Sequence, residues 1–441
     1  MNTAGLSLDN IPAFKVPMRF FLVAPWFGIL ASLCLLLHPE AFASRWNPAM
    51  LSFVHLLTLG FAAMVMLGAM IQVLPVVSSQ QMPTANHTTH WIRAFLALGC
   101  LSLSVGFLFN LNAFLGISIV LLALAFILFL SFMGIALVRT GRGGATLLCL
   151  RLAALSLLGT VLLGVLQLST YLELEWITYL AERTDDHAML GLLGWGMLLI
   201  MGVSFQVIPM FHVAPAFPKW LTWTTPTALF LSLSAAIITD NSFHILALIL
   251  ALTAVITYAF SALSVLYRRK RKLPDYTVRF WQFALSNLAL VASLSLLELL
   301  IPGILPTHFQ PELALGFGFG IGFVLSVILG MLQKIVPFLM YLHLQRACLH
   351  DPTAFMALPN MKQLIPSKRS KWQYRLHIMT VLGIYLCFLL QQLQSYMAVI
   401  TALLMLSNFS WLLRSLLLAN SRYNKSLPAS SAPTTVNTTA V

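Results

Sequence analysis

The chain has 441 residues, of which 59% are hydrophobic and 8% charged, and its net charge is +13. Soluble domains carry about 25% charged residues, so the composition excludes an ordinary cytosolic globule, a disordered chain and a nucleic-acid-binding module. It indicates an all-α polytopic membrane protein whose main partner is the lipid bilayer. The five cysteines are scattered without a CxxC pair, which argues against a disulfide framework or a structural zinc site.

Twelve apolar segments are long enough to cross a bilayer, which takes about 20 residues. Residues 1–17 hold no cleavable-looking apolar core, so the first span is expected to act as the targeting signal. With a cytoplasmic N-terminus, only Arg45 and Arg183 among the loop cations fall outside, and the positive-inside rule then predicts that both termini are cytoplasmic, in a bacterial inner membrane. The predicted spans are 18–38, 50–77, 92–110, 113–138, 146–171, 187–211, 220–240, 242–267, 278–301, 312–342, 374–394 and 396–419.

Spans two, six and ten share the pattern G-x7-G-x3-[QK]-x2-P, and its copies are 134 and 128 residues apart. This repeat predicts three four-helix units in series, related by a pseudo-threefold axis. The units are 18–138, 146–267 and 278–419, preceded by a cytoplasmic segment 1–17 and followed by a disordered cytoplasmic tail 420–441. The repeated residues are Gly60, Gly68, Gln72 and Pro75; Gly194, Gly202, Gln206 and Pro209; and Gly322, Gly330, Lys334 and Pro337.

The spacing of each block places its members on one helix face. The glycines permit close helix contact, and packing is their simplest role. Gln72, Gln206 and Lys334 would form a polar ring near the cytoplasmic face. Lys334 is ionisable within a span, which makes it a functional candidate. The alternative is that its side chain snorkels to the nearby interface.

His55 lies about one turn inside the outer end of span two, and His187 opens span six. When the repeats are aligned, the two histidines differ in depth by only two residues. Neutral imidazole binds metals and heme iron, and two facing histidines can hold a heme between helices. The alternative is a hydrogen-bonded interfacial histidine, and for His187 a wet interface beside Asp185 and Asp186. The remaining histidines near helix ends are expected to be solvated (His38, His244 and His308), to cap helix C-termini (His212 and His343), or to lie at the cytoplasmic face (His87, His90, His350 and His377).

With twelve spans in three units and a histidine near the outer end of span two, the chain resembles the heme–copper oxidase subunit I superfamily. Its sequence is most similar to the divergent NnrS-like branch. The residues that carry this resemblance are His55-Leu-Leu-Thr-Leu-Gly60, His187-Ala-Met-Leu-Gly191 and the three repeated blocks. The resemblance implies that His55 binds a b-type heme, that His187 contributes to a heme or copper centre, and that His308 is a second choice of ligand.

The chain departs from true oxidases in two places. It has no histidine between Thr222 and Asp240, and none within 312–342. A complete oxygen-reducing centre is therefore not expected. We expect a heme- or copper-binding membrane protein that serves nitric-oxide or metal stress or the respiratory chain, with a respiratory-chain or periplasmic redox partner. The alternatives are a transporter or channel that uses the polar ring, and a partner subunit without a cofactor.

Overall fold

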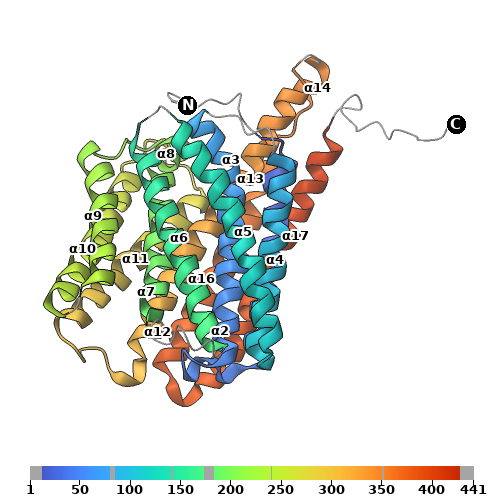
Figure 1. Ribbon diagram of the computed structural model, residues 1–441. Helices are drawn as coiled ribbons and strands as arrows, with labels where there is room; N and C mark the ends of the chain where they lie inside the picture. The colour runs from blue at the N-terminus through green and yellow to red at the C-terminus, as the bar shows by residue number, and fades with distance from the viewer. Residues whose placement is uncertain are drawn as a thin grey trace.

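The computed structural model describes residues 12–79, 85–140, 143–172, 183–239, 241–349 and 352–427. Throughout these ranges the ordered elements are helices, and no strand occurs among them (Figure 1). Eleven helical segments of the described chain are long and apolar enough to cross a membrane. The prediction of an all-α, multi-pass membrane protein therefore agrees with the structure at this level.

Of the twelve predicted spans, only 374–394 is not among the eleven segments that are long and apolar enough to cross a membrane. The structure has a helix there, α16 (Ser367–Leu389), but this helix begins seven residues before the predicted span. Its first turns carry Lys368, Arg369 and Lys371, and Gln373, Arg375 and His377 follow them. Even the part of the helix after Lys371 is therefore less apolar than the other eleven segments.

The helices fall into three consecutive sets. The first holds α1 (Lys15–Leu37), η2 (Pro39–Ala43), α2 (Pro48–His55), η3 (Leu56–Ala63), α3 (Met64–Ser78), α4 (Ala85–Phe109) and α5 (Asn112–Arg139). The second holds α6 (Ala145–Tyr171), α7 (Thr184–Met189), η5 (Leu190–Met197), α8 (Leu198–His212), α9 (Lys219–Ile238) and α10 (Asn241–Tyr267). The third holds α11 (Tyr276–Leu300), η6 (Thr307–Phe309), α12 (Pro311–Phe317), η7 (Gly318–Leu325), α13 (Ser326–Ala347), α14 (Pro352–Met356), α15 (Met361–Leu364), α16, η8 (Gln391–Leu393) and α17 (Gln394–Lys425).

Each set contains one π-helical segment of eight residues, inserted in its second long helix. These segments, η3, η5 and η7, begin at Leu56, Leu190 and Gly318. Their starts are 134 and 128 residues apart, which are the offsets of the repeated glycine blocks. A π-helical turn is rare and occurs mostly at functional sites, so its recurrence at one register marks the same place in each set.

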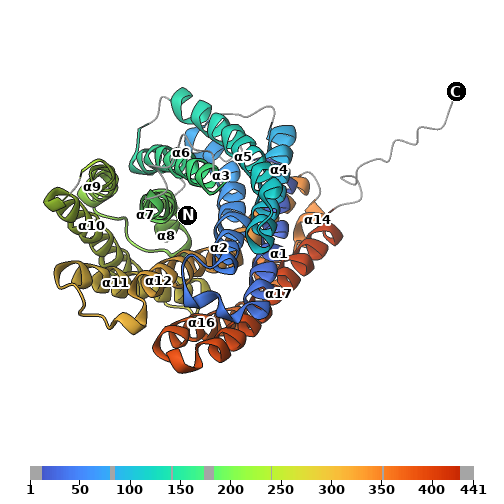
Figure 2. The same cartoon turned by 60° about the horizontal axis from the view of Figure 1, so that its bottom comes forward.

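The glycines of the repeat lie against the first helix of their own set. A Cβ atom on Gly60 would collide with Phe27 of α1, and one on Gly68 would collide with Phe20. The corresponding neighbours are Ser156 and Cys149 on α6, and Asn287 and Phe280 on α11. In all three sets the two neighbours are seven residues apart, so the same helix pair packs in the same register. The helices that carry the glycines lie towards the middle of the bundle, with α9, α10 and α16 on its rim (Figure 2).

The two ends of the bundle differ in charge. The rings of Phe14 and Tyr423 lie 4.4 Å apart, so α1 begins where α17 ends. We call this the basic end, because Lys15, the run Arg268–Lys272 and Lys425 lie there. The opposite end, where α2, α7 and α12 begin, carries Asp185, Asp186 and Glu312, and we call it the acidic end.

The predicted tail 420–441 starts too early, because α17 continues to Lys425. Residues 428–441 and His350 lie outside the described residues.

Candidate functional site

His55 and His187 face each other across the boundary between the first and second sets. Their ring centroids are 6.4 Å apart, and the ring planes differ by 26°. His55 is the last residue of α2 and precedes η3, whereas His187 lies in α7, three residues before η5. The structure thus brings together the two histidines that the sequence singled out.

Each imidazole is oriented by a backbone carbonyl. Nδ1 of His55 lies 2.7 Å from the carbonyl oxygen of Leu51, and Nδ1 of His187 lies 2.9 Å from that of Thr160 on α6. A carbonyl can only accept a hydrogen bond, so Nδ1 carries the proton in both rings. In a neutral ring Nε2 then has the free lone pair. This is the tautomer of a histidine that ligates a metal through Nε2.

The surroundings of the pair are largely apolar and tightly packed. The ring of Phe107 lies 5.8 Å from that of His55, and Tyr171 meets Phe107 edge-on. On the other side, the ring of His187 lies directly against Gly164 of α6, where a Cβ atom would be 2.9 Å from Cε1. Any larger residue at position 164 would displace the ring.

The donor set fits a ligand that takes two imidazoles. Both rings would offer Nε2 to a metal ion or heme iron held by the pair. Among the described residues no group of three or more His, Cys, Asp or Glu side chains could hold a metal ion. The pair would supply two imidazole ligands to such a metal ion or heme iron.

His308, the other predicted ligand, is not part of this pair. It lies in η6 with an exposed side chain. Among the described contacts, none joins it to His55 or His187.

Lys334 has a partner that the sequence did not suggest. Its Nζ donates to Oδ2 of Asp275 at 3.1 Å, and both side chains are about a quarter to a third exposed. Asp275 caps α11, where its other oxygen accepts from the amide of Thr277. Burial alone would raise the pKa of Asp275, but the charge and hydrogen bond of Lys334 outweigh it and hold the pKa below its usual value.

The predicted polar ring is not joined by hydrogen bonds. The Gln72 side chain is buried, and its Oε1 has no partner in the described structure. No described hydrogen bond links Gln72, Gln206 and Lys334. His212 is likewise buried with both ring nitrogens unpartnered among the described residues, so it does not cap its helix. His343 does contact its own helix, with Nδ1 2.9 Å from the Leu339 carbonyl.

A buried polar chain in the third set was missed by the sequence analysis. His377 of α16 is fully buried, although it was assigned to the cytoplasmic face. Its Nε2 lies 2.6 Å from Oγ of Ser326, and that hydroxyl donates to the carbonyl of Gly322 in η7. On the other side of the ring, Asn408 of α17 donates to Nδ1 at 3.5 Å, and Gln373 donates to Asn408.

A second, shorter chain ends on the same π-helical segment. The hydroxyl of Tyr385 donates to Asn287 at 2.6 Å, and Asn287 donates to the carbonyl of Gly318 at 2.6 Å. Both chains thus run from α16 to η7. Sequence periodicity could not have found them, since they depend on which faces of α11, α13, α16 and α17 meet.

No protein-family model matches the sequence, and no curated protein matches it. The likeness to heme–copper oxidases therefore rests on the residues already named.

Proposed function

We propose that this protein binds a b-type heme between His55 and His187, in a multi-pass membrane protein of the heme–copper oxidase type. The observation that carries the proposal is the facing pair of imidazoles, each with Nδ1 tied to a carbonyl. In this proposal the chain crosses a bacterial inner membrane twelve times, with α16 as the span of lowest hydropathy. Three four-helix units are related by a pseudo-threefold axis, and the basic end faces the cytoplasm.

The chain's own residues would orient and protect the ligand. The carbonyls of Leu51 and Thr160 fix the ring orientations, and Phe107 shields one side from water. A heme held by these two histidines would supply one-electron transfer. The proposed role is electron transfer or a response to nitric-oxide or metal stress, with a respiratory-chain or periplasmic redox partner. Copper, which also binds imidazole, is the second candidate ligand.

The test is the absorption spectrum of the purified protein, with a pyridine-hemochrome assay and metal analysis. We expect a Soret band in protein expressed with ample heme, and its loss in His55→Ala and His187→Ala. His308→Ala, His212→Ala and His343→Ala serve as matched controls and should keep the heme. The proposal fails if the wild type is colourless and free of metal, or if His55→Ala keeps full occupancy.

A second candidate function is transport of protons or small polar solutes through the third unit. The chain from Gln373 through Asn408 and His377 to Ser326 favours it, because buried polar groups in membrane spans are costly and often mark such paths. In this candidate function the proton or solute would pass along this buried chain, and not along the predicted ring of Gln72, Gln206 and Lys334.

Proton flux into proteoliposomes, driven by a potassium diffusion potential, tests the second candidate. His377→Leu should abolish a flux that passes through this chain, whereas His343→Leu should not. Equal fluxes in the wild type, His377→Leu and empty vesicles would exclude it.

A further inference from the structure

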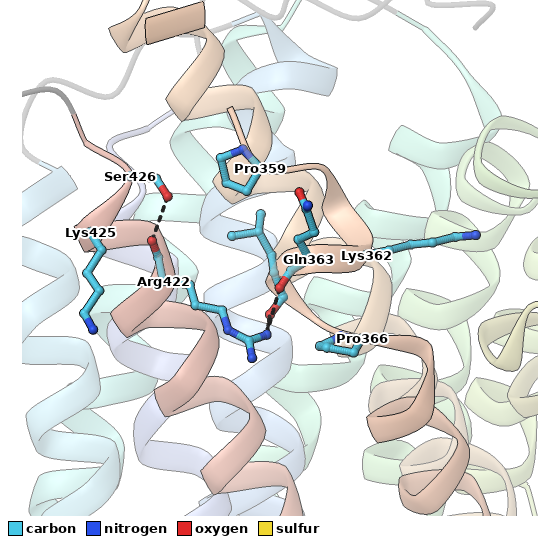
Figure 3. Close-up of a pocket in the computed structure, with 8 residues that line it drawn as sticks. Pro359, Lys362, Gln363, Pro366, Arg422, Lys425 and Ser426 are labelled. Atoms are coloured by element: carbon cyan, nitrogen blue, oxygen red, sulfur yellow. Dashed lines mark hydrogen bonds between the residues drawn. The ribbon is translucent and has the colours of Figure 1, made fainter. Parts of the chain in front are cut away.

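A hollow lies on the surface of the basic end, between α15 and the last turns of α17. Its lining includes Pro359, Lys362, Pro366, Arg422 and Lys425. Figure 3 shows Arg422 in the middle, reaching the backbone at the end of α15, with Lys362 and Lys425 extending outward on opposite sides. Arg422 donates to the carbonyls of Gln363 and Leu364 at 2.7 and 3.0 Å. These bonds fix the guanidinium and hold α15 against α17.

The hollow belongs to a strongly basic stretch of the chain. Residues 352–441 contain eight Lys and Arg residues and no Asp or Glu. In the part of the chain that the structure describes, no hydrogen bond or ion pair engages the ammonium groups of Lys362 and Lys425. The two lysines thus keep their donors for an external anion.

A separate apolar groove lies on α17, about one helical turn before the hollow. It lies between α1 and α17 and is lined by Trp26, Ile29, Leu413, Leu417 and Leu418, with Arg414 at its side. Leu418, Arg422 and Lys425 are four and three residues apart, so they share one helix face. With a rise of about 1.5 Å per residue, the groove and the hollow are roughly 6 Å apart along the helix.

We infer that the hollow and the groove form a binding site for an anionic phospholipid. The phosphate would lie at the edge of the hollow near Lys425, with Lys362 at the other edge, and an acyl chain would run beside Leu418 into the groove. Basic pockets between membrane helices at the cytoplasmic side bind anionic headgroups in this way. A free phosphate would use the cations but not the groove, which is why we commit to the lipid. This inference does not depend on heme binding.

Basic loops also occur at the cytoplasmic side of membrane proteins without binding a specific lipid. The test must therefore distinguish binding at Lys362 and Lys425 from a general attraction of anionic lipids to this end. We would measure retained lipid by native mass spectrometry on the full chain in detergent, titrated with phosphatidylglycerol or with zwitterionic phosphatidylcholine. The test variant is Lys362→Gln/Lys425→Gln. The matched control is Lys219→Gln/Arg268→Gln, which removes two exposed cations from the second set at the same end.

The wild type should retain phosphatidylglycerol in preference to phosphatidylcholine. The test variant should bind it about thirtyfold more weakly, since each surface cation contributes about fivefold. The control should bind as the wild type does. Equal binding by the test variant, or an equal loss in the control, would overturn the proposal. So would full competition by inorganic phosphate at millimolar concentration, because the occupant would then need no acyl chain.

Discussion

Nη1 of Arg45 lies 2.8 Å from a carboxylate oxygen of Asp185, two residues before His187. The same nitrogen lies 2.9 Å from Glu312, the second residue of α12. One guanidinium therefore joins the starts of α7 and α12 to the loop that leads into α2. The three helices that carry π-helical segments are linked by charge at the acidic end, next to the histidine pair.

This link should contribute little to stability by itself. Both carboxylates are largely exposed, and exposed ion pairs contribute about 0–1 kcal/mol each. We expect Arg45→Gln to lower the thermal midpoint slightly at low salt and to match the wild type in high salt, where exposed charges are screened. A large loss that persists in high salt would show that Arg45 acts through packing instead.

Gly164→Ala should disturb the histidine pair without removing a ligand. The added methyl group would press on the ring of His187 and turn it away from His55. We expect lower heme content in the hemochrome assay, with the thermal midpoint of the heme-free protein nearly unchanged. Gly116→Ala is the control, because a Cβ atom there meets no atom within 4 Å. Equal heme content in both variants would refute this account of Gly164.

Gly322→Ala and Gly320→Ala compare two glycines of one π-helical segment. A Cβ atom on Gly322 would collide with Asn287, whereas one on Gly320 meets nothing within 4 Å. Overpacking of this kind costs about 1–3 kcal/mol, so Gly322→Ala should lower the free energy of unfolding and Gly320→Ala should not. Thermal denaturation in detergent measures both, and similar midpoints would argue against close packing on α11.

Lys334→Met should destabilise the protein in a pH-dependent way. Removing Lys334 leaves the partly buried Asp275 carboxylate without its cation, which costs about 1–3 kcal/mol for a pair between the exposed and buried limits. The pKa of Asp275 is below its unfolded value of about 3.9. The contribution of the pair is therefore complete above that value and is lost as the pH falls through the lower, folded pKa.

The measurement for Lys334→Met is the thermal midpoint between pH 3 and 7. Its difference from the wild type should be largest near neutral pH and should shrink below about pH 4. Asp275→Asn should show a smaller loss than Lys334→Met at neutral pH, since Lys334 can still reach the interface with its long stem. A midpoint for Lys334→Met equal to the wild type at every pH would favour simple snorkelling.

The helical spans could be predicted because a bilayer imposes a minimum apolar length on every crossing. The prediction missed the start of α16, since Lys368, Arg369 and Lys371 give its first turns the composition of a loop. That shift also explains the error at His377. A helix that begins at Ser367 carries His377 almost three turns in, among other helices, and not at the membrane surface.

The histidine pair could be predicted from the sequence, whereas the partner of Lys334 could not. His55 and His187 could be aligned because the repeat fixes their depth relative to the glycine blocks. Asp275 could not be assigned to Lys334, because 59 residues separate them and only the packing of α11 on α13 brings them together. The π-helical segments were also missed, since one wider turn leaves the apolar composition unchanged.

The three π-helical segments also record the history of the chain. A wide turn arises when an extra residue is accommodated in a helix whose flanks stay fixed. Three separate insertions would have no reason to fall at the same distance from a glycine block in every copy. The simplest descent is that a single ancestral four-helix protein already carried this wide turn, and that gene duplication copied it twice.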